Sequence, residues 1–301
     1  MRLHVIPALG KVKLEKLTPQ HVDAALTRME AGVGAYSRTI LRAALNKALK
    51  WGMVYRNAAA LSEPPRPARR KARFLEPDEA ERLLEAAEGH KDEALFVCAL
   101  MLGMREGELL GLQWSDLDLD AGKWRLSRAL KWIRVRGQRG EHRLGETKTH
   151  EEHTIELPQA VVYALRRHRQ RQREARLAAK PGRWLESDYV FTSVTGRTSV
   201  TGRPQHKSVI SGYHLQRLLK KAGLPAVRFH DLRDSCGSLL LSRGIDPKVI
   251  QELLGHRDIG TTMNVYAHVL KAPKRHAADV MDLMFPRLAV GRADGKNGVK
   301  V

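Results

Sequence analysis

The sequence between residues 229 and 268 reads FHDLRDSCGSLLLSRGIDPKVIQELLGHRDIGTTMNVYAH, in which His230 and Arg233 are followed by His256 and Tyr266. A phosphodiester under attack spreads negative charge over its non-bridging oxygens, so a protein must place fixed cations there and aim a nucleophile in line. The permanently charged, bidentate guanidinium of Arg233 suits the first role, and the hydroxyl of Tyr266 can form a covalent intermediate. The stretch therefore indicates phosphoryl transfer to a tyrosine.

Helical spacing supports this interpretation. Apolar residues recur at Leu232, Cys236, Leu239 and Leu240, which predicts a helix over 229–243 with one buried stripe. His230 and Arg233 share a different face of that helix and can point at one ligand. A second helix is predicted to begin after Asp246 and to end at Gly255, so His256 falls in the turn that follows.

These motifs resemble the carboxyl-terminal box of the tyrosine recombinases, the phage integrase family, with its H-x-x-R, its L-G-H and its following tyrosine. Upstream, residues 102–116 read LGMREGELLGLQWSD and are similar to the first box of that family. The segment from Thr147 to Thr149 is similar to the β-hairpin motif that carries the family's lysine. Order and approximate intervals agree across residues 74–288, and this ordered combination is far more specific than a lone H-x-x-R.

The resemblance implies a DNA strand transferase. Tyr266 would attack the scissile phosphate to give a 3′-phosphotyrosyl link and a free 5′-hydroxyl, and Arg105 and Arg233 would clamp the phosphate oxygens. Lys148 would protonate the leaving 5′-oxygen, and His230 would assist proton transfer at the tyrosine. His256 would hydrogen-bond the phosphate. Glu108, one turn after Arg105, is expected to hold that arginine in place.

The lysine motif departs from the family pattern. Family members often carry an arginine shortly after the lysine turn, where this chain has His153 and Thr154. The alternative is Lys131, which precedes an arginine-rich stretch at 132–139. Its position is more typical of a strand end or of a contact to the DNA backbone, so Lys148 is preferred.

Composition indicates a polyanionic partner. Lysine and arginine total 53 against 33 acidic residues, giving a formal net charge of +20 and a pI of about 10.3. Basic residues cluster at 66–73 and again at 166–176. A solvated helix face is the alternative for the second cluster. Double-stranded DNA is the predicted partner, with contacts from Arg69, Arg70, Lys71, Lys131, Arg169, Arg171 and Arg173.

Other features point away from metals, cofactors and membranes. Cys98 and Cys236 lie in apolar helical contexts and are interpreted as small core residues of a protein in a reducing cytosol. No histidine pair has ligand spacing with cysteine, and no G-x-x-x-x-G-K-[ST] motif is present. The longest apolar run, at 94–104, is too short to span a bilayer, and no signal peptide begins the sequence. A cytoplasmic location is expected.

The predicted fold is mainly α with a small antiparallel β-sheet. A composition break with three prolines suggests two domains. By resemblance, 1–63 is a partial helical core-binding domain with two recognisable helices, and 64–73 is a basic, Pro-rich linker. Residues 74–288 form the tyrosine recombinase catalytic domain, and 289–301 form a disordered tail.

Three alternatives to an active recombinase remain. A type IB topoisomerase-like enzyme would share the phosphotyrosyl chemistry without synapsis. A non-catalytic DNA-binding regulator could use 229–243 and 246–254 as a helix-turn-helix, although that leaves Arg105, Lys148 and Tyr266 unexplained. A degraded recombinase would fold without acting. For the active enzyme, the resemblance implies a homo-tetramer on synapsed DNA, with accessory DNA-bending or directionality factors.

Overall fold

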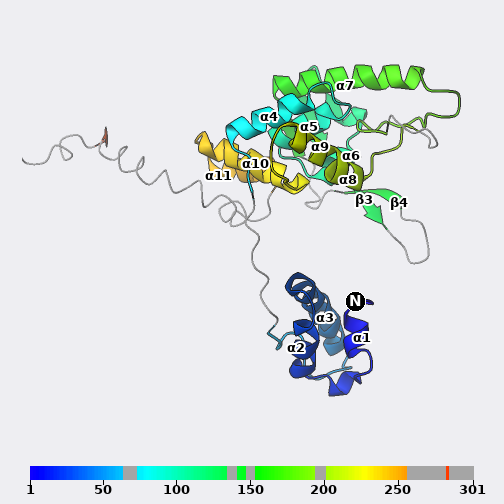
Figure 1. Cartoon of the computed structure of the whole chain (residues 1–301), viewed down its shortest axis with the longest axis vertical. Coiled ribbons are helices and arrows are strands. Elements are labelled where there is room, and N and C mark those ends of the chain that lie inside the picture. Colours follow the sequence, from blue (N-terminus) through cyan, green and yellow to red (C-terminus); the bar gives the residue numbers. More distant parts are fainter. Residues whose placement is uncertain (64–72, 134–140, 147–152, 194–200, 256–282, 285–301) are drawn as a thin grey trace, which may run out of the picture. The chain divides into compact units, whose positions relative to one another are not determined.

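The computed structural model describes residues 1–63, 73–133, 141–146, 153–193, 201–255 and 283–284 (Figure 1). The chain divides into two compact units, Met1–Lys71 and Ala72–Val301. Each unit has a separate hydrophobic core. The predicted tail and nearly all of the predicted linker lie outside the described residues.

The first unit is helical. It contains α1 (Val5–Leu9), the 3₁₀ helix η1 (Leu14–Lys16), α2 (Pro19–Thr27) and α3 (Ala31–Lys50). The hydroxyl of Thr18 caps α2 by accepting a hydrogen bond from the His21 backbone at 3.3 Å. The sequence predicts only two helices here, because the five residues of α1 are too few to show a helical period. Side chains from α1, α2 and α3 form the core of this unit.

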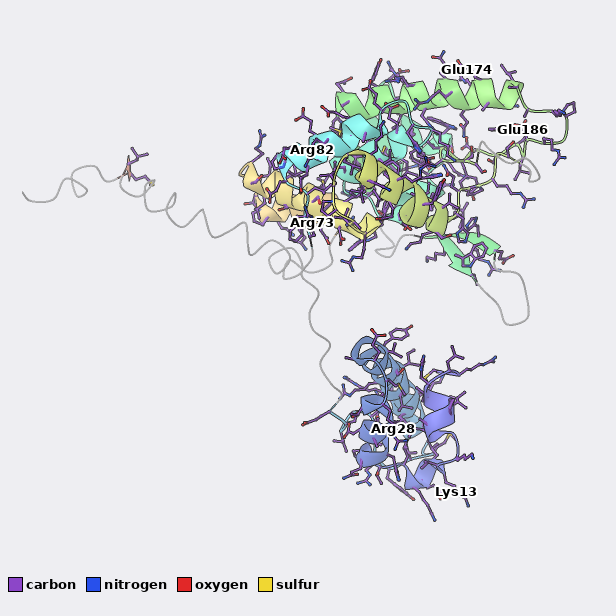
Figure 2. All side chains as sticks on the ribbon, viewed as in Figure 1. Lys13, Arg28, Arg73, Arg82, Glu174 and Glu186 are labelled. Atoms are coloured by element: carbon purple, nitrogen blue, oxygen red, sulfur yellow. The ribbon has the colours of Figure 1, made fainter. Side chains whose placement is uncertain are left out.

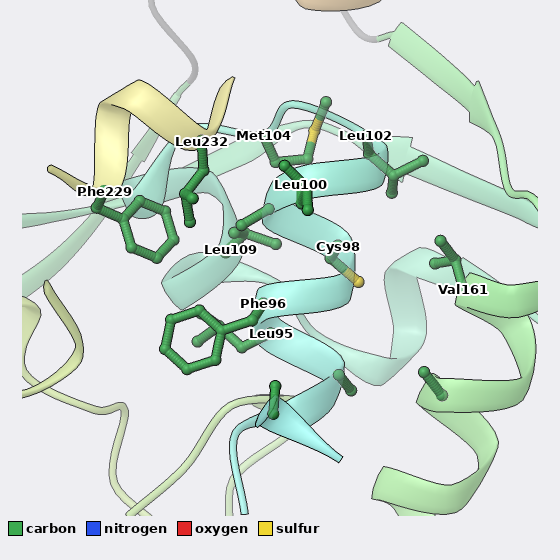
Figure 3. Close-up of a cluster of buried hydrophobic side chains, with 14 of the residues drawn as sticks. Leu95, Phe96, Cys98, Leu100, Leu102, Met104, Leu109, Val161, Phe229 and Leu232 are labelled. Carbon is green, nitrogen blue, oxygen red and sulfur yellow. The ribbon is translucent and has the colours of Figure 1, made fainter. Parts of the chain in front are cut away.

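The second unit is built around α5 (Glu93–Met101), whose side chains are buried on nearly every side. A helix that is apolar all round is expected in the interior. It packs against α4 (Pro77–Ala87), α7 (Gln159–Leu177) and α10 (Phe229–Ser242). Figure 3 shows Val161 of α7 on one side of α5, and Phe229 and Leu232 of α10 on the other.

Within the part of the chain that the structure describes, the strands form two separate antiparallel sheets. One contains β1 (Leu117–Asp118), β2 (Lys123–Leu126) and β5 (His153–Glu156), in the order β1-β2-β5. The other is a hairpin of β3 (Arg128–Ile133) and β4 (Glu141–Glu146), with Arg128 opposite Glu146. The mainly α fold with small antiparallel sheets is confirmed, but the sequence predicts one sheet. The strands divide because β3 packs on α6 (Glu106–Gly111) instead of continuing β2.

Short elements complete this unit: η2 (Trp114–Asp116), α8 (Lys207–Val209), the π-helical turn η3 (Ile210–His214), α9 (Leu215–Lys221) and α11 (Pro247–Leu254). The carboxylate of Asp246 caps α11 by accepting from the Lys248 backbone at 2.6 Å. Gly255 ends that helix in the left-handed conformation, with φ 59°. Outside the two sheets, Gln113 and Tyr189 form an isolated antiparallel bridge.

Candidate active site

Arg105 is the N-cap residue of α6, and Glu108 controls its side chain. One carboxylate oxygen of Glu108 accepts from the backbone N–H of Arg105 at 2.8 Å, and the other accepts from its guanidinium Nη1 at 2.7 Å. The Glu108 side chain is 3% exposed and that of Arg105 is 29% exposed. A buried carboxylate therefore holds one edge of the guanidinium of this partly exposed side chain.

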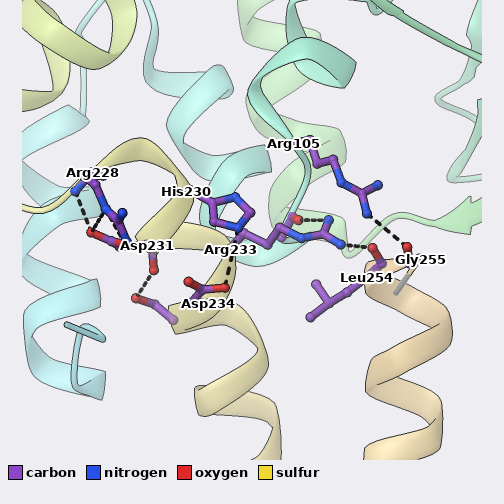
Figure 4. A network of polar contacts seen from close by, with 10 residues as sticks. Arg105, Arg228, His230, Asp231, Arg233, Asp234, Leu254 and Gly255 are labelled. Atoms are coloured by element: carbon purple, nitrogen blue, oxygen red, sulfur yellow. Dashed lines mark hydrogen bonds and ion pairs between the residues drawn. The ribbon is translucent and has the colours of Figure 1, made fainter. Parts of the chain in front are cut away.

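Arg233 lies on α10 and is only 1% exposed. Its Nη1 donates to the carbonyl of Gly103 at 2.7 Å, and its Nη2 donates to the carbonyl of Leu254. The Nη2 of Arg105 donates to the next carbonyl, that of Gly255, at 3.0 Å. The two guanidiniums thus bind consecutive carbonyls at the end of α11 (Figure 4).

Two glycines make this approach possible. Gly103 has φ 63°, and a Cβ at this position would lie 2.4 Å from a methyl carbon of Leu254 and 3.3 Å from Cys236. Any other residue would be strained by the left-handed backbone and would also displace Leu254. Gly255 has the same left-handed conformation. Gly103 and Gly255 therefore allow the backbone turns at both positions to approach the side chains of Arg105 and Arg233.

His230 precedes Arg233 by one turn of α10, and its Nε2 lies 4.0 Å from a carboxylate oxygen of Asp234. Partial burial lowers the pKa of His230, and the nearby Asp234 carboxylate only partly offsets that effect. Burial also raises the pKa of Asp234. The His230 side chain is 63% exposed, so its imidazole can exchange protons with solvent and with a bound substrate.

The structure thus brings Arg105, Glu108, His230 and Arg233 together around α6, α10 and the end of α11. Lys131 lies on β3 and is exposed, opposite Arg143. The other predicted residues lie outside the described residues: Lys148, His256, Tyr266, Arg69, Arg70 and Lys71. Sequence reasoning did not single out Gly103 or the Leu254 carbonyl, because no local pattern shows which backbone an arginine will contact.

Two of the predicted DNA contacts on α7, Arg169 and Arg171, have partners within the chain. The guanidinium of Arg169 stacks over Trp114 at 5.2 Å, and Arg171 pairs with Glu93 at 3.0 Å. Arg173 lines a small cavity beside Trp114. Figure 1 shows α7 at the edge of the second unit, away from α10, and Figure 2 labels Glu174 on this helix. A DNA contact here remains a prediction.

These geometries define a test by salt titration. Each phosphate contact contributes about 0.9 to the slope of log affinity against log salt concentration. If α7 lies on DNA, Arg169→Ala combined with Arg173→Ala should reduce the steepness of this slope by the contribution of roughly two phosphate contacts. Arg171→Ala is the contrast, because that side chain is committed to Glu93 and should mainly lower the melting temperature. An unchanged slope in the double variant would identify α7 as a solvated face.

The sequence also predicts that both cysteines are core residues and that the chain has neither a metal site nor a membrane-spanning segment. Burial raises the pKa of Cys98 and of Cys236 to about 12, so both thiols stay protonated. Within the described ranges, no group of three or more His, Cys, Asp or Glu side chains could hold a metal ion. In the same ranges, every helix is too short or too polar to cross a membrane.

Two guanidiniums close together have the charge and the bidentate donors that suit binding of an oxyanion such as a phosphate. Residues 73–272 match the model of the phage integrase family. The chain belongs to this family, the tyrosine recombinases, as the sequence motifs predict.

Named relatives agree with this assignment. A tyrosine recombinase XerC-like protein of Caldanaerobacter subterraneus subsp. tengcongensis is 33% identical over 218 residues, covering 69% of this chain and 53% of that protein. An integrase of Streptomyces ambofaciens is 32% identical over 296 residues, covering 94% of this chain and 73% of that protein. The chain thus spans about half the length of the first relative and about three quarters of the second.

Solved structures show the same fold. The integrase of the Tn1549 transposon, in complex with a circular intermediate DNA, superposes with a TM-score of 0.72 at 21% identity, covering 93% of this chain and 92% of that chain. A lambda integrase dimer bound to a core site superposes with a TM-score of 0.61 at 19% identity, covering 99% and 89%. At these identities the likeness concerns the fold alone.

Proposed function

We propose that the protein is a site-specific DNA recombinase that cuts and rejoins strands through a 3′-phosphotyrosyl intermediate. The observation that carries the proposal is the convergence of Arg105 and Arg233 on the consecutive carbonyls of Leu254 and Gly255. Two guanidiniums that reach oxygens one peptide apart can also bind two non-bridging oxygens of one phosphate. His256, the next residue in the chain, is the proposed further donor.

In the proposed cleavage step, a bond forms between the Tyr266 hydroxyl oxygen and phosphorus as the bond from phosphorus to the 5′-oxygen breaks. The phenolic proton passes to a base, for which the imidazole of His230 is the candidate. Lys148 gives its proton to the leaving 5′-oxygen. Attack of a 5′-hydroxyl from the partner strand reverses these changes, so the bond energy is retained and no nucleotide cofactor is needed.

Double-stranded DNA is the proposed substrate. The net charge of +20 supports a polyanionic ligand, and the Tn1549 and lambda integrases that share the fold are bound to DNA in their structures. We further propose a homo-tetramer on synapsed DNA, with accessory factors that bend the DNA or set direction. A cytoplasmic location follows from the same proposal.

The test is covalent trapping on a nicked suicide substrate, followed by a strand-exchange assay on Holliday junctions. A recombinase is expected to form the adduct and to resolve junctions. Adduct formation with relaxation but without exchange would indicate a topoisomerase-like activity. DNA binding without any adduct would indicate a non-catalytic regulator.

Cleavage is expected to persist in EDTA. The proposed mechanism stabilises the phosphate with arginine side chains, so a divalent ion has no assigned role at the transition state. The measurement is the rate of adduct formation with excess EDTA and after restoration of Mg²⁺. Strict dependence on the added ion would point to a metal nuclease and would contradict the proposal.

A further inference from the structure

Two glycines on one face of α6 let a strand lie directly against the helix. Gly107 and Gly111 are four residues apart and share a face. A Cβ on Gly111 would lie 2.7 Å from the backbone nitrogen of Leu130 and 3.1 Å from the carbonyl carbon of Ala129. A Cβ on Gly107 would lie 3.0 Å from the Leu130 carbonyl oxygen. These are backbone atoms of β3 and cannot rotate away, so an added methyl group must move the strand.

An ion pair with a buried carboxylate attaches the same end of the hairpin. The guanidinium Nη2 of Arg128 lies 2.9 Å from a carboxylate oxygen of Asp116, whose side chain is 1% exposed. Nη1 of Arg128 donates to the side-chain oxygen of Gln113. Both partners follow α6 closely in the chain. The base of the β3–β4 hairpin is thus held to α6 by backbone packing and to the segment after α6 by the ion pair of the partly exposed Arg128 with the buried Asp116.

This attachment lies where the chain leaves the hairpin for Lys148. Arg128 stands opposite Glu146 in the β3–β4 register. Lys148 follows Glu146 by two residues, so their Cα atoms are at most about 7 Å apart. The other end of α6 carries Arg105 as its N-cap. The short helix α6 therefore carries Arg105 at its beginning. Its face with Gly107 and Gly111 packs against the β3–β4 hairpin, whose second strand precedes Lys148 in the chain.

We propose that Gly111 and Arg128 are positioning residues for the leaving-group acid, setting the place of Lys148 relative to Arg105 through the base of the hairpin. The inference rests on the proposed function. Both residues are assigned an indirect role. Gly111 acts through its contact with β3, and Arg128 acts through its ion pair with Asp116. A displacement of about 1 Å at a reacting group can cost about 10²-fold in rate, so the packing distance at Gly111 bears directly on cleavage.

The experiment measures cleavage of two suicide substrates that differ only in the bridging 5′-atom, oxygen or sulfur. A sulfur leaving group needs no protonation. Gly111→Ala is expected to cleave the oxygen substrate about 10²-fold more slowly than the parent protein and to recover most of that loss on the sulfur substrate. Gly107→Ala and Arg128→Gln should show smaller losses of the same kind. Gly212→Ala is the matched control, since its Cβ would meet nothing within 4 Å.

Equal slowing of Gly111→Ala on both substrates, with DNA affinity intact, would overturn the inference, because a packing role alone gives no sulfur rescue. If Gly111→Ala fails to fold in thermal melting, Gly107→Ala and Arg128→Gln are read in the same two ways. Failure of the proposed function looks different, since the parent protein would then form no adduct on either substrate. If the parent protein is active and sulfur rescues Lys148→Ala but not Gly111→Ala, the positioning role of Gly111 is contradicted and the proposed function is retained.

Discussion

Replacing Tyr266 with phenylalanine is expected to abolish the covalent protein–DNA adduct while leaving DNA affinity nearly unchanged. The substitution removes only the attacking oxygen and keeps the ring, so contacts to the DNA backbone are retained. The adduct is measured on a labelled, nicked suicide substrate in a denaturing gel, and affinity is measured by titration at fixed salt.

Tyr163→Phe provides the matched control for this experiment. Tyr163 lies on α7 and is 64% exposed, and its loss of a hydroxyl should change neither measurement. If the adduct still forms in Tyr266→Phe, the nucleophile is a different residue. A large loss of affinity in that variant would instead show that the hydroxyl contributes to binding.

Arg105→Ala and Arg233→Ala should each reduce the cleavage rate by roughly 10³ to 10⁵-fold and change DNA affinity far less. Their charge matters most when the phosphate passes through its more negative transition state, whereas each is one phosphate contact among many in the bound complex. The measurements are single-turnover cleavage and equilibrium binding on the same DNA. Affinity that falls as steeply as the rate would mean that the arginines only anchor DNA.

The two arginine variants should differ in stability. Arg233 is 1% exposed and binds the Gly103 and Leu254 carbonyls, and a buried polar group left unpaired costs about 1 to 3 kcal/mol. Arg233→Ala should therefore lower the melting temperature clearly, and the cleavage assay needs a temperature well below that transition. Arg105→Ala leaves the Glu108 carboxylate without its guanidinium partner, so Glu108→Gln combined with Arg105→Ala separates lost chemistry from an uncompensated charge.

Sulfur at the bridging 5′-position distinguishes these losses from a missing acid. The arginine variants should gain little from it, because they lack stabilisation of the phosphate rather than a proton for the leaving group. Lys148→Ala should recover most of its rate. If sulfur restores the cleavage rate of Lys131→Ala and not that of Lys148→Ala, the general acid is Lys131 on β3.

Patterns carried by neighbouring residues were sufficient to predict much of the helical structure. Asp246 and Gly255 mark the beginning and end of α11, and Thr18 marks the beginning of α2, because capping involves groups within one turn. The apolar spacing within 229–243 predicts α10 to within one residue. The motif order likewise predicted family membership, which the family match at 73–272 confirms.

Contacts between distant segments decided the rest. Arg105 and Gly255 are 150 residues apart in the chain, and no local pattern shows that Arg105 will donate to that carbonyl. Arg171 turns toward Glu93, 78 residues away, although the sequence shows only a basic run. The close approach of β3 to Gly107 and Gly111 joins segments of α6 and of the hairpin that no local pattern connects. The sequence thus determined which chemical groups are present and where helices begin and end, because those depend on local bonds. Tertiary packing alone decided which backbone atoms the arginines meet.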